Sequence, residues 1–324
     1  MGHFHPENII TNRFLEDLDI GTSESWIMER VGIENRRTVL PLDYIKQTKN
    51  ANRLDAPKVA QYNHSQMGAS AARMALRRAS LRREDIGMLI AGTSTPDNIS
   101  PADAAGIAKE LGVEVPCFDM NSACSSFGLQ MNFLSRMRPD ALPPYILVVN
   151  PETMTKAVDY ADRGVAVLFG DGSAAAVVST NVPSRAKFSH CTFDSRPSAW
   201  NKVGIAYDWL FYQEGNAIQG FAIRKTTEGV QLLQKATPAD AQRFIFIGHQ
   251  ANMGMLKTVC DRAGILPQNH WYSVDQYGNT ASCGAPGVLS MHWDEIRNGD
   301  HIAMSIVGAG LSWAHIMLTV EDGG

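Results

Sequence analysis

The chain has 324 residues, 44% of them hydrophobic and 19% charged, and it carries a formal net charge of -4. This composition is typical of a globular protein that buries a large core, as two similar halves or as one large α/β unit. The negative charge gives no basic footprint for nucleic acid, and no apolar run is long enough for a membrane helix.

The N-terminus and the cysteines indicate a reducing, cytoplasmic setting. Residues 1–6 lack the basic stretch and apolar segment of a secretory signal. The five cysteines show no CxxC spacing, so neither a disulfide framework nor a structural zinc site is expected. His3 and His5 lack further ligands, and we expect no metal site.

The first half of the chain alternates predicted helices and strands. The polar segment 41–66 is expected to be a loop or a surface helix. An Ala-rich helical pattern, continuous apolar runs and Pro101 at a helix start then predict regular elements. The expected helices are 68–81, 101–111 and 124–137, and the expected strands are 86–93, 117–120, 145–149, 165–169 and 174–178.

The second half repeats this order. Its expected strands are 244–247, 271–274, 302–307 and 314–320, and its expected helices are 252–263 and 287–297. Asp119 and Asp275 both end an expected strand, and Ile146 and Ile302 both open one. Each pair is 156 positions apart. A constant offset indicates an internal duplication, with halves 1–178 and 179–324.

Cys124 stands between a predicted buried strand and a predicted helix, and only small residues flank it. At a helix N-terminus the dipole would lower the pKa of the thiol and raise its thiolate fraction. The small neighbours leave room for a substrate. The duplication would also bring Cys124 close to Asn279, since both follow equivalent strands. By contrast, Cys117, Cys191 and Cys260 are expected to be small buried hydrophobes.

His249 and Asn279 are the other candidate residues. His249 follows a predicted strand at the expected start of a helix, where the dipole disfavours the imidazolium and keeps the ring neutral. Asn279 lies in a Gly-Asn-Thr turn, which alone is a weak signal. The glycines Gly308 and Gly310 would let backbone N–H groups approach a ligand closely.

Taken together, these segments resemble the β-ketoacyl-acyl carrier protein synthase III family of the thiolase superfamily, over nearly the whole chain. The matching segments are SWIMERVGI at 25–33 with Arg36 and Arg37, NSAC at 121–124, DRG at 162–164, FGDG at 169–172, and those around His249, Asn279 and Gly310. The resemblance implies duplicated α/β halves in a layered α-β-α-β-α sandwich. The cysteine would lie in the first half, and the histidine and asparagine in the second.

The resemblance also implies a decarboxylative condensation. Cys124 would carry an acyl group from acyl-coenzyme A, and malonyl-acyl carrier protein would supply the attacking carbon. His249 and Asn279 match the pair that binds the malonyl thioester oxygen, and the N–H groups of Cys124 and Gly310 match an oxyanion hole. Two donors at that oxygen stabilise an enolate, and covalent capture divides the reaction into two halves. The substrates are implied without a cofactor.

Further positions follow from the same resemblance, which also implies a homodimer. The coenzyme A contacts would be Trp26, Arg30, Arg163 and Asn252. The acyl pocket would involve Ile99 and Ser100, on a stretch that family members supply across the dimer interface. The candidates for docking an acidic carrier protein are Lys225, Lys257 and Arg262.

The chain departs from the family pattern at several places. Residues 2–7 already form the first corner, so a preceding strand is expected to be absent or truncated. The segment 41–66 is longer than usual and is expected near the pocket mouth. Ser125 and Ser126 replace a common Ala-Gly, and Phe221 replaces an asparagine that often touches coenzyme A. Ser100 replaces a pocket-closing aromatic, which predicts an acyl group longer than acetyl or one with a polar end.

Three other functions stay open. A cysteine hydrolase of the papain type has the same chain order of Cys124, His249 and Asn279, but its local cysteine signature is absent. Acyl transfer to an oxygen or nitrogen nucleophile, or a condensation without decarboxylation, would use the same fold. A non-catalytic partner subunit would typically lack the nucleophile, which is present here.

Overall fold

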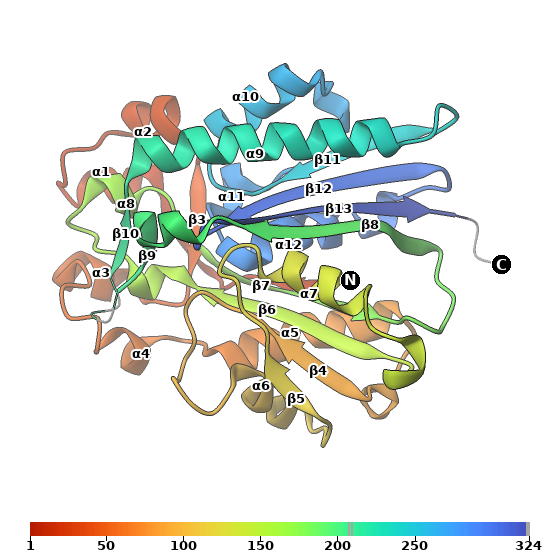
Figure 1. Cartoon of the computed structure of the whole chain (residues 1–324). Coiled ribbons are helices and arrows are strands. Elements are labelled where there is room, and N and C mark those ends of the chain that lie inside the picture. Colours follow the sequence, from red (N-terminus) through yellow and green to blue (C-terminus); the bar gives the residue numbers. More distant parts are fainter. Residues whose placement is uncertain (207, 209, 322–324) are drawn as a thin grey trace.

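The computed structural model describes residues 1–206, 208 and 210–321. These residues form five layers, with two mixed sheets, helices between them and helices outside each sheet (Figure 1). This arrangement confirms the predicted α-β-α-β-α sandwich. Within the described residues, no helix is both long and apolar enough to span a membrane.

The first sheet consists, in spatial order, of β1 (Gly2–Phe4), β7 (Asp171–Val178), β6 (Ile146–Thr153), β4 (Met88–Ala91) and β5 (Cys117–Asp119). β4 is parallel to β5 and β6, whereas β7 is antiparallel to β6 and β1. All eight residues of β6 are buried, because helices cover both faces of the sheet.

The second sheet has the same plan. It consists of β11 (Arg243–Gly248), β12 (Asp300–Gly308), β13 (Ser312–Val320) and β8 (Ala186–Ser195), in this order. β11 and β12 are parallel, and β13 is antiparallel to both neighbours. A parallel bridge from Phe246 to His270 lies where β5 lies in the first sheet. We propose from this match that residues 1–178 and 179–324 are the two halves of an internal duplication.

The helices complete the layers. α7 (Ser126–Leu134) and α12 (Gly284–Met291) pack between the sheets and contact strands of both. α5 (His64–Arg78) and α6 (Asp103–Leu111) cover the outer face of the first sheet. α9 (Gly215–Ala236) covers the second sheet, and α10 (Met253–Ala263) packs on α9.

Shorter elements gather mostly at one end of the layers, on the left in Figure 1. The short α-helices are α1 (Asn12–Asp17), α2 (Glu24–Val31), α3 (Leu42–Thr48), α4 (Ala56–Val59), α8 (Arg163–Ala166) and α11 (Val274–Tyr277). The remaining strands form two pairs, β2 (Asn8–Thr11) with β3 (Asn35–Thr38) and β9 (Val203–Ile205) with β10 (Phe211–Gln213). The 3-10 helices are Arg83–Asp85, Pro139–Ala141, Met154–Ala157, Pro197–Lys202, Pro267–Asn269, Ala281–Cys283 and Trp293–Glu295.

Side-chain caps determine where two of the long helices begin. Asn63 and Gln66 form a reciprocal capping box at the start of α5, which therefore begins four residues before the expected helix. Asn252 Oδ1 accepts the Met255 N–H at 2.8 Å and starts α10, which ends at Gly264 with φ 66°.

Two expectations about strands are wrong, and a third is wrong in part. A first strand is present as the three-residue β1, paired with β7, so it is short and not absent. Residues 165–169 do not form a strand, because Asp162 caps the short helix α8 through the Gly164 N–H (2.7 Å). Residues 271–274 contribute no strand, since the N–H groups of Ser273 and Val274 donate to Gln250 Oε1. Asp275 therefore lies in α11 and not at a strand end.

Candidate active site

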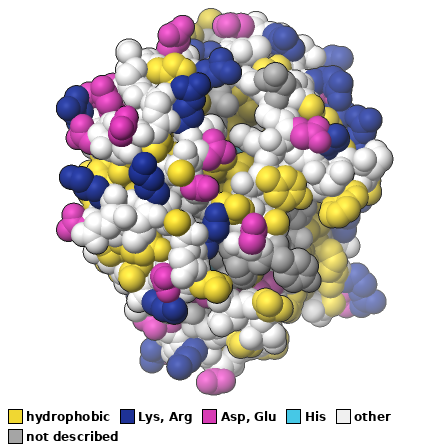
Figure 2. Space-filling view, turned by 90° about the vertical axis from the view of Figure 1, so that its left-hand side faces the viewer, with side chains coloured by type: hydrophobic (Ala, Val, Ile, Leu, Met, Phe, Trp, Pro, Cys, Tyr) yellow, Lys and Arg dark blue, Asp and Glu magenta, His cyan; other side chains and the backbone are white. Residues whose placement is uncertain are grey.

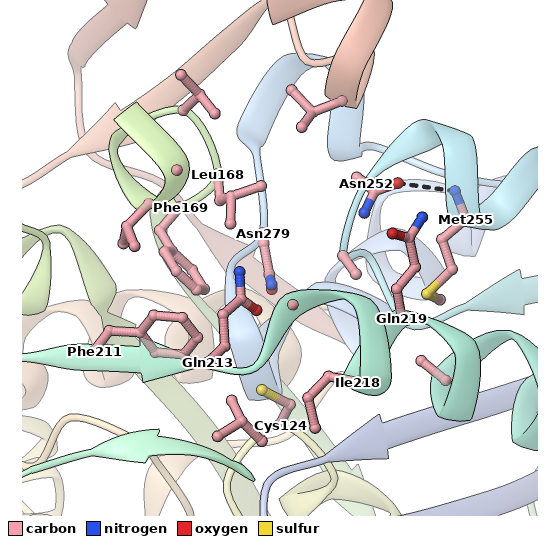
Figure 3. A pocket seen from close by; sticks show the side chains of 18 of the residues that line it. Cys124, Leu168, Phe169, Phe211, Gln213, Ile218, Gln219, Asn252, Met255 and Asn279 are labelled. Carbon is pink, nitrogen blue, oxygen red and sulfur yellow. Dashed lines mark hydrogen bonds between the residues drawn. The ribbon is translucent and has the colours of Figure 1, made fainter. Parts of the chain in front are cut away.

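A pocket of about 750 Å³ is lined by Cys124, His249 and Asn279 together. The three residues come from separate segments: Cys124 precedes α7, His249 follows β11, and Asn279 follows α11. Figure 3 shows Cys124 and Asn279 among the side chains that point into the pocket. The fold thus brings into one cavity the three residues selected from the sequence.

The loop that carries Cys124 is held in a fixed conformation. Ala123 has a left-handed backbone with φ 47°, and its N–H donates to Asn121 Oδ1 at 2.8 Å. Such a backbone is unfavourable for a residue other than glycine, so the surrounding hydrogen bonds must impose it. The hydroxyl groups of Ser125 and Ser312 hydrogen-bond at 2.8 Å and join this loop to the turn between β12 and β13.

The predicted low pKa of Cys124 is wrong. Burial, and next the charge of Glu152, raise the pKa of the thiol to about 12. α7 begins only at Ser126, so the thiol is not in the first helical turn, and the surrounding protein solvates a thiolate poorly. The Ser94 hydroxyl acts in the opposite direction and lowers this pKa. In the free protein at neutral pH the sulfur is therefore a thiol.

His249 is neutral, as predicted, although the cause is different. Its side chain is buried, and desolvation lowers its pKa to about 4. The backbone N–H of His249 donates to Ser305 O at 3.0 Å, which ties the residue to β12. Among the described residues no group bonds its Nδ1 atom. A neutral imidazole in this pocket can donate one N–H to a ligand.

Asn279 presents the donor end of its amide. Its side-chain oxygen accepts the Ala281 N–H at 3.0 Å, and this bond determines which way the amide faces. Its backbone N–H donates to Leu168 O at 2.8 Å, and its carbonyl accepts the Gly170 N–H at 3.1 Å. The Nδ2 group is thus the part of the side chain that remains for a ligand, and Figure 3 shows the side chain in the pocket.

Four residues predicted to bind coenzyme A all line the same pocket, namely Trp26, Arg30, Arg163 and Asn252. The Arg163 guanidinium lies over the Trp26 ring at 5.1 Å, and it also donates to Gly21 O at 2.6 Å. An indole with a guanidinium on its face suits an aromatic base. Figure 2 views this end of the molecule, where hydrophobic side chains line a hollow among charged ones.

In the turn between β12 and β13, a residue at the pocket lies one position before the expected backbone donor, Gly310. Ala309 and Leu311 line the pocket, whereas Gly310 is not among its lining residues. Gly308 makes the close approach that the sequence suggested for this turn, because a side chain there would meet Ser125 N at 2.8 Å. Ala309 is therefore the better candidate for a backbone donor toward the pocket.

The predicted acyl-pocket residues do not line this pocket. Ile99 is 91% exposed, and Ser100 is exposed beside it. Their expected role across a dimer interface stays a prediction. The segment 41–66 also contributes no lining residue, and instead packs Ile45 and Ala56 into the core. Phe221 does line the pocket, where it packs edge-on against Trp313.

The three predicted docking residues lie on α9 and α10, outside the pocket. Lys225 forms an ion pair with Glu228 at 2.8 Å and lies over the Trp313 ring. Lys257 and Arg262 are exposed on α10. A carrier-protein contact at these residues stays a prediction.

Much of the pocket wall comes from residues that no sequence motif identified. Leu168, Val203, Phe211 and Ile218 make the wall apolar, and the amides of Gln213 and Gln219 interrupt it (Figure 3). We predicted no element between residues 179 and 243, although the apolar residues 218, 222, 230 and 233 recur at helical spacing. This periodicity would have identified α9.

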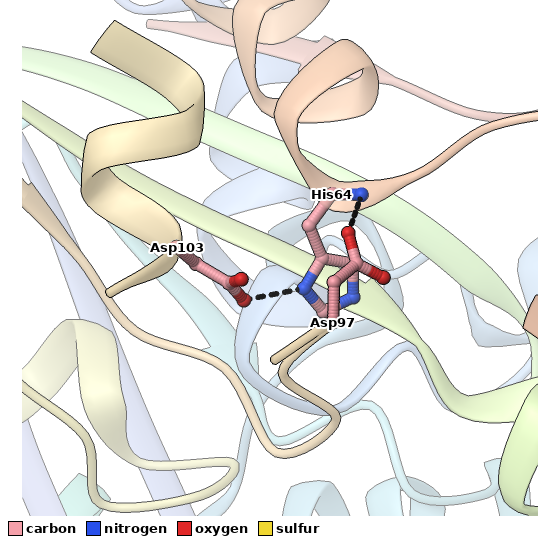
Figure 4. A group of neighbouring side chains, drawn as sticks. All are labelled: His64, Asp97 and Asp103. Carbon is pink, nitrogen blue, oxygen red and sulfur yellow. Dashed lines mark hydrogen bonds and ion pairs between the residues drawn. The ribbon is translucent and has the colours of Figure 1, made fainter. Parts of the chain in front are cut away.

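A second polar cluster lies outside the pocket (Figure 4). His64, Asp97 and Asp103 are close enough together for a metal site, but their ligand atoms already have partners. His64 Nδ1 hydrogen-bonds Asp103 at 2.7 Å. Asp97 accepts the backbone N–H of His64 and forms an ion pair with Lys156 at 2.8 Å. The cluster therefore anchors the N-termini of α5 and α6 to each other.

Comparison with known proteins gives one consistent family. Residues 118–197 match the sequence model of 3-oxoacyl-[acyl-carrier-protein (ACP)] synthase III, and residues 233–320 match the model of its C-terminal part. The chain is 29% identical to the β-ketoacyl-[acyl-carrier-protein] synthase III of Sulfurovum sp., covering 98% of this chain and 94% of the relative. It is 28% identical to synthase III 2 of Halalkalibacterium halodurans, with the same coverage.

Solved structures agree with the sequence comparison. The crystal structure of 3-oxoacyl-[acyl-carrier-protein] synthase III from Aquifex aeolicus superposes with a TM-score of 0.86 at 27% identity, over 98% of this chain and 97% of that one. The corresponding enzyme from Thermus thermophilus gives a TM-score of 0.83 at 28% identity, with the same coverage.

Proposed function

The chain belongs to the 3-oxoacyl-[acyl-carrier-protein] synthase III family, and on this premise we propose that it condenses an acyl group from acyl-coenzyme A with malonyl-acyl carrier protein. One observation supports the assignment of this reaction to particular residues. A thiol, a neutral imidazole and an oriented amide donor, from Cys124, His249 and Asn279, line one pocket.

In the first half-reaction Cys124 attacks the thioester carbon of acyl-coenzyme A. The C–S bond to coenzyme A breaks, a new C–S bond to Cys124 forms, and the thiol proton leaves with coenzyme A. Trp26 and Arg163 hold the adenine at the pocket mouth, and Arg30 lies near phosphate. The backbone N–H groups of Cys124 and Ala309 are proposed to stabilise the oxyanion.

In the second half-reaction the malonyl thioester loses carbon dioxide. The electron pair of the broken C–C bond becomes an enolate, whose charge lies on the thioester oxygen. His249 and Asn279 donate to that oxygen, and burial increases the strength of both hydrogen bonds. The enolate carbon then attacks the acyl carbonyl on Cys124, a C–C bond forms, and the C–S bond to Cys124 breaks. The β-ketoacyl thioester is released, and the Cys124 thiolate takes up a proton from water to become the thiol again.

The test follows both half-reactions on the intact protein. Incubation with acyl-coenzyme A should add the mass of one acyl group, and Cys124→Ala should abolish that addition. Cys283→Ala is the matched control, because this buried cysteine has an equally raised pKa of about 12 and does not line the pocket. An acyl adduct that persists in Cys124→Ala would overturn the assignment of the nucleophile.

The partners and setting belong to the same proposal. The reaction needs its two thioester substrates and no cofactor. Lys225, Lys257 and Arg262 would guide the acidic carrier protein. The protein would act in the cytoplasm as a homodimer, with Ile99 and Ser100 of each copy near the acyl pocket of the other.

Acyl transfer to an oxygen or nitrogen nucleophile would give coenzyme A release without carbon dioxide release from malonyl thioesters.

A further inference from the structure

Glu152 is a buried carboxyl close to the pocket that the reaction above does not use. It is the seventh residue of β6, and its side chain is fully buried. No ion pair with a Lys or Arg compensates it among the described residues. A buried carboxyl in this position costs stability unless hydrogen bonds satisfy it, so the donors that surround it indicate what it holds in place.

Two loops supply most of these donors. Ser94, just after β4, donates its N–H at 3.0 Å and its hydroxyl at 3.1 Å to Glu152 Oε1. Ser282, in the turn Ala281–Cys283, donates its N–H at 3.1 Å and also its hydroxyl to the same oxygen. Thr93 and Thr95 donate to the other oxygen at 3.1 and 3.2 Å.

Each loop leads directly to a pocket residue. The Ser94 hydroxyl lowers the pKa of the Cys124 thiol. The Ala281 N–H, one residue before Ser282, donates to Asn279 Oδ1 and determines how that amide faces. One carboxyl therefore connects the surroundings of the nucleophile with the residue that orients the enolate donor.

We propose that Glu152 is a positioning residue, which ties the Ala281–Cys283 turn to the Ser94 loop and thereby holds the turn in the position that aims the Asn279 amide into the pocket. The inference rests on the proposed function for the roles of Cys124 and Asn279. Glu152 does not line the pocket and touches no substrate. Its effect passes through Ser94 on one side and Ser282 on the other.

The carboxyl also has an electrostatic effect that packing alone would not have. Its negative charge raises the pKa of Cys124 and of Cys283. A test must leave the other charged or titratable side chains near Glu152 and Cys124 unchanged. His64 is such a group near Glu152. The charged or titratable side chains that line the pocket with Cys124 are Arg30, Asp162, Arg163, Tyr212 and His249.

Glu152→Gln separates the electrostatic effect from the positioning effect. We expect it to raise the alkylation rate of Cys124 and to lower the rate of malonyl decarboxylation. Loss of the charge should lower the thiol pKa and raise the thiolate fraction, so that alkylation of Cys124 at a fixed pH becomes several-fold faster. Glutamine keeps one acceptor oxygen but not its negative charge, so the hydrogen bonds that Ser94 and Ser282 donate become weaker and the turn loosens. Malonyl decarboxylation should therefore fall by about ten- to hundredfold. Peptide mass spectrometry assigns the alkylated cysteine.

Two further variants provide the controls. Glu152→Asp keeps the charge, so its alkylation rate should return to that of the wild type. Asp300→Asn removes another buried carboxylate, which pairs with Arg243 away from the pocket, and should change neither rate. Wild-type rates of both alkylation and decarboxylation in folded Glu152→Gln would overturn the proposal.

If Glu152→Gln does not fold, Ser282→Ala tests the proposed role of Glu152 instead. It removes one donor and leaves the carboxyl with the others, and it should slow decarboxylation while acylation of Cys124 continues. Equal decarboxylation in Ser282→Ala and wild type would overturn the inference. The alkylation experiment needs no acyl substrate, so failure of the proposed condensation would be seen separately, as a wild type that alkylates but does not acylate.

Discussion

Ala123 and Ala281 both have a left-handed φ, 47° and 46°, and each donates its N–H to the side-chain oxygen of an asparagine two residues earlier. The asparagines are Asn121 and Asn279, one in each proposed half. Cys124 follows the first alanine, and Ser282 follows the second. The same loop geometry thus presents a nucleophile in one half, and in the other it orients a hydrogen-bond donor.

Asn121→Ala should slow acylation of Cys124 by about tenfold while decarboxylation is retained. The substitution removes the acceptor that holds Ala123 in a left-handed backbone, and unfolding should cost about 1 kcal/mol less. Stopped-flow or intact-mass kinetics measure acylation, and chemical denaturation measures stability. Asn121→Asp keeps the acceptor oxygen and should acylate faster than Asn121→Ala. Equal acylation by the alanine and aspartate variants would contradict this.

Asn279→Asp and His249→Ala should each reduce malonyl decarboxylation by about a hundredfold to a thousandfold, because each removes a donor to the enolate oxygen. Acylation should stay largely intact. Asn279→Asp is informative because it keeps the oxygen that accepts the Ala281 N–H. Carbon dioxide release and acyl adduct formation are measured separately. Parallel loss of both activities would favour a hydrolase-like triad.

Trp26→Ala should raise the KM for acyl-coenzyme A by about tenfold, with little change in the maximal rate of acylation. The ring and Arg163 form a stacked pair at the pocket mouth, and such a surface contributes on the order of 1 kcal/mol to binding an aromatic base. Trp293→Ala is the matched control, because Arg185 covers that ring at 5.7 Å outside the pocket. A KM unchanged by Trp26→Ala would remove the assignment.

Acyl groups longer than acetyl should acylate Cys124 efficiently, and Ser100→Phe should shift the preference toward short chains. Each methylene that the pocket buries contributes about 0.8 kcal/mol. The new ring would act across the proposed dimer interface, since Ser100 does not line the pocket of its own chain. Acylation rates against chain length test this, with Leu54→Phe as an exposed control. A wild type that prefers acetyl, unchanged by Ser100→Phe, would refute it.

His315 should make the protein less stable in acid. Burial, and next the charge of Lys225, lower its pKa to about 4, whereas an unfolded histidine titrates near its ordinary value of 6.5. Between these values the unfolded state binds the extra proton, so the free energy of unfolding falls as pH falls. The slope from this residue is about 1.4 kcal/mol per pH unit between pH 6.5 and 4. Denaturation of His315→Gln should show a shallower slope, and an unchanged slope would argue against a neutral buried ring.

The sequence alone determined the elements whose signals are local. Continuous apolar runs identified β4, β6, β11 and β12, because strands buried on both faces need apolar residues at every position. The motifs around Cys124, His249 and Asn279 identified the family and the pocket residues. The neutral state of His249 was predicted from its place at a helix start, although its cause, burial, is a property of the tertiary structure.

Only the tertiary structure decided the rest, because it depends on groups that are distant in the chain. Gln250 Oε1 accepts the backbone N–H groups of residues 273 and 274, so these groups do not pair with a strand. No local sequence pattern shows this. The pKa of Cys124 follows from burial and from Glu152, 28 positions away, and not from the nearby helix start. Hydrophobic periodicity reports which face of an element is buried, whereas hydrogen-bond competition and local dielectric depend on which elements meet.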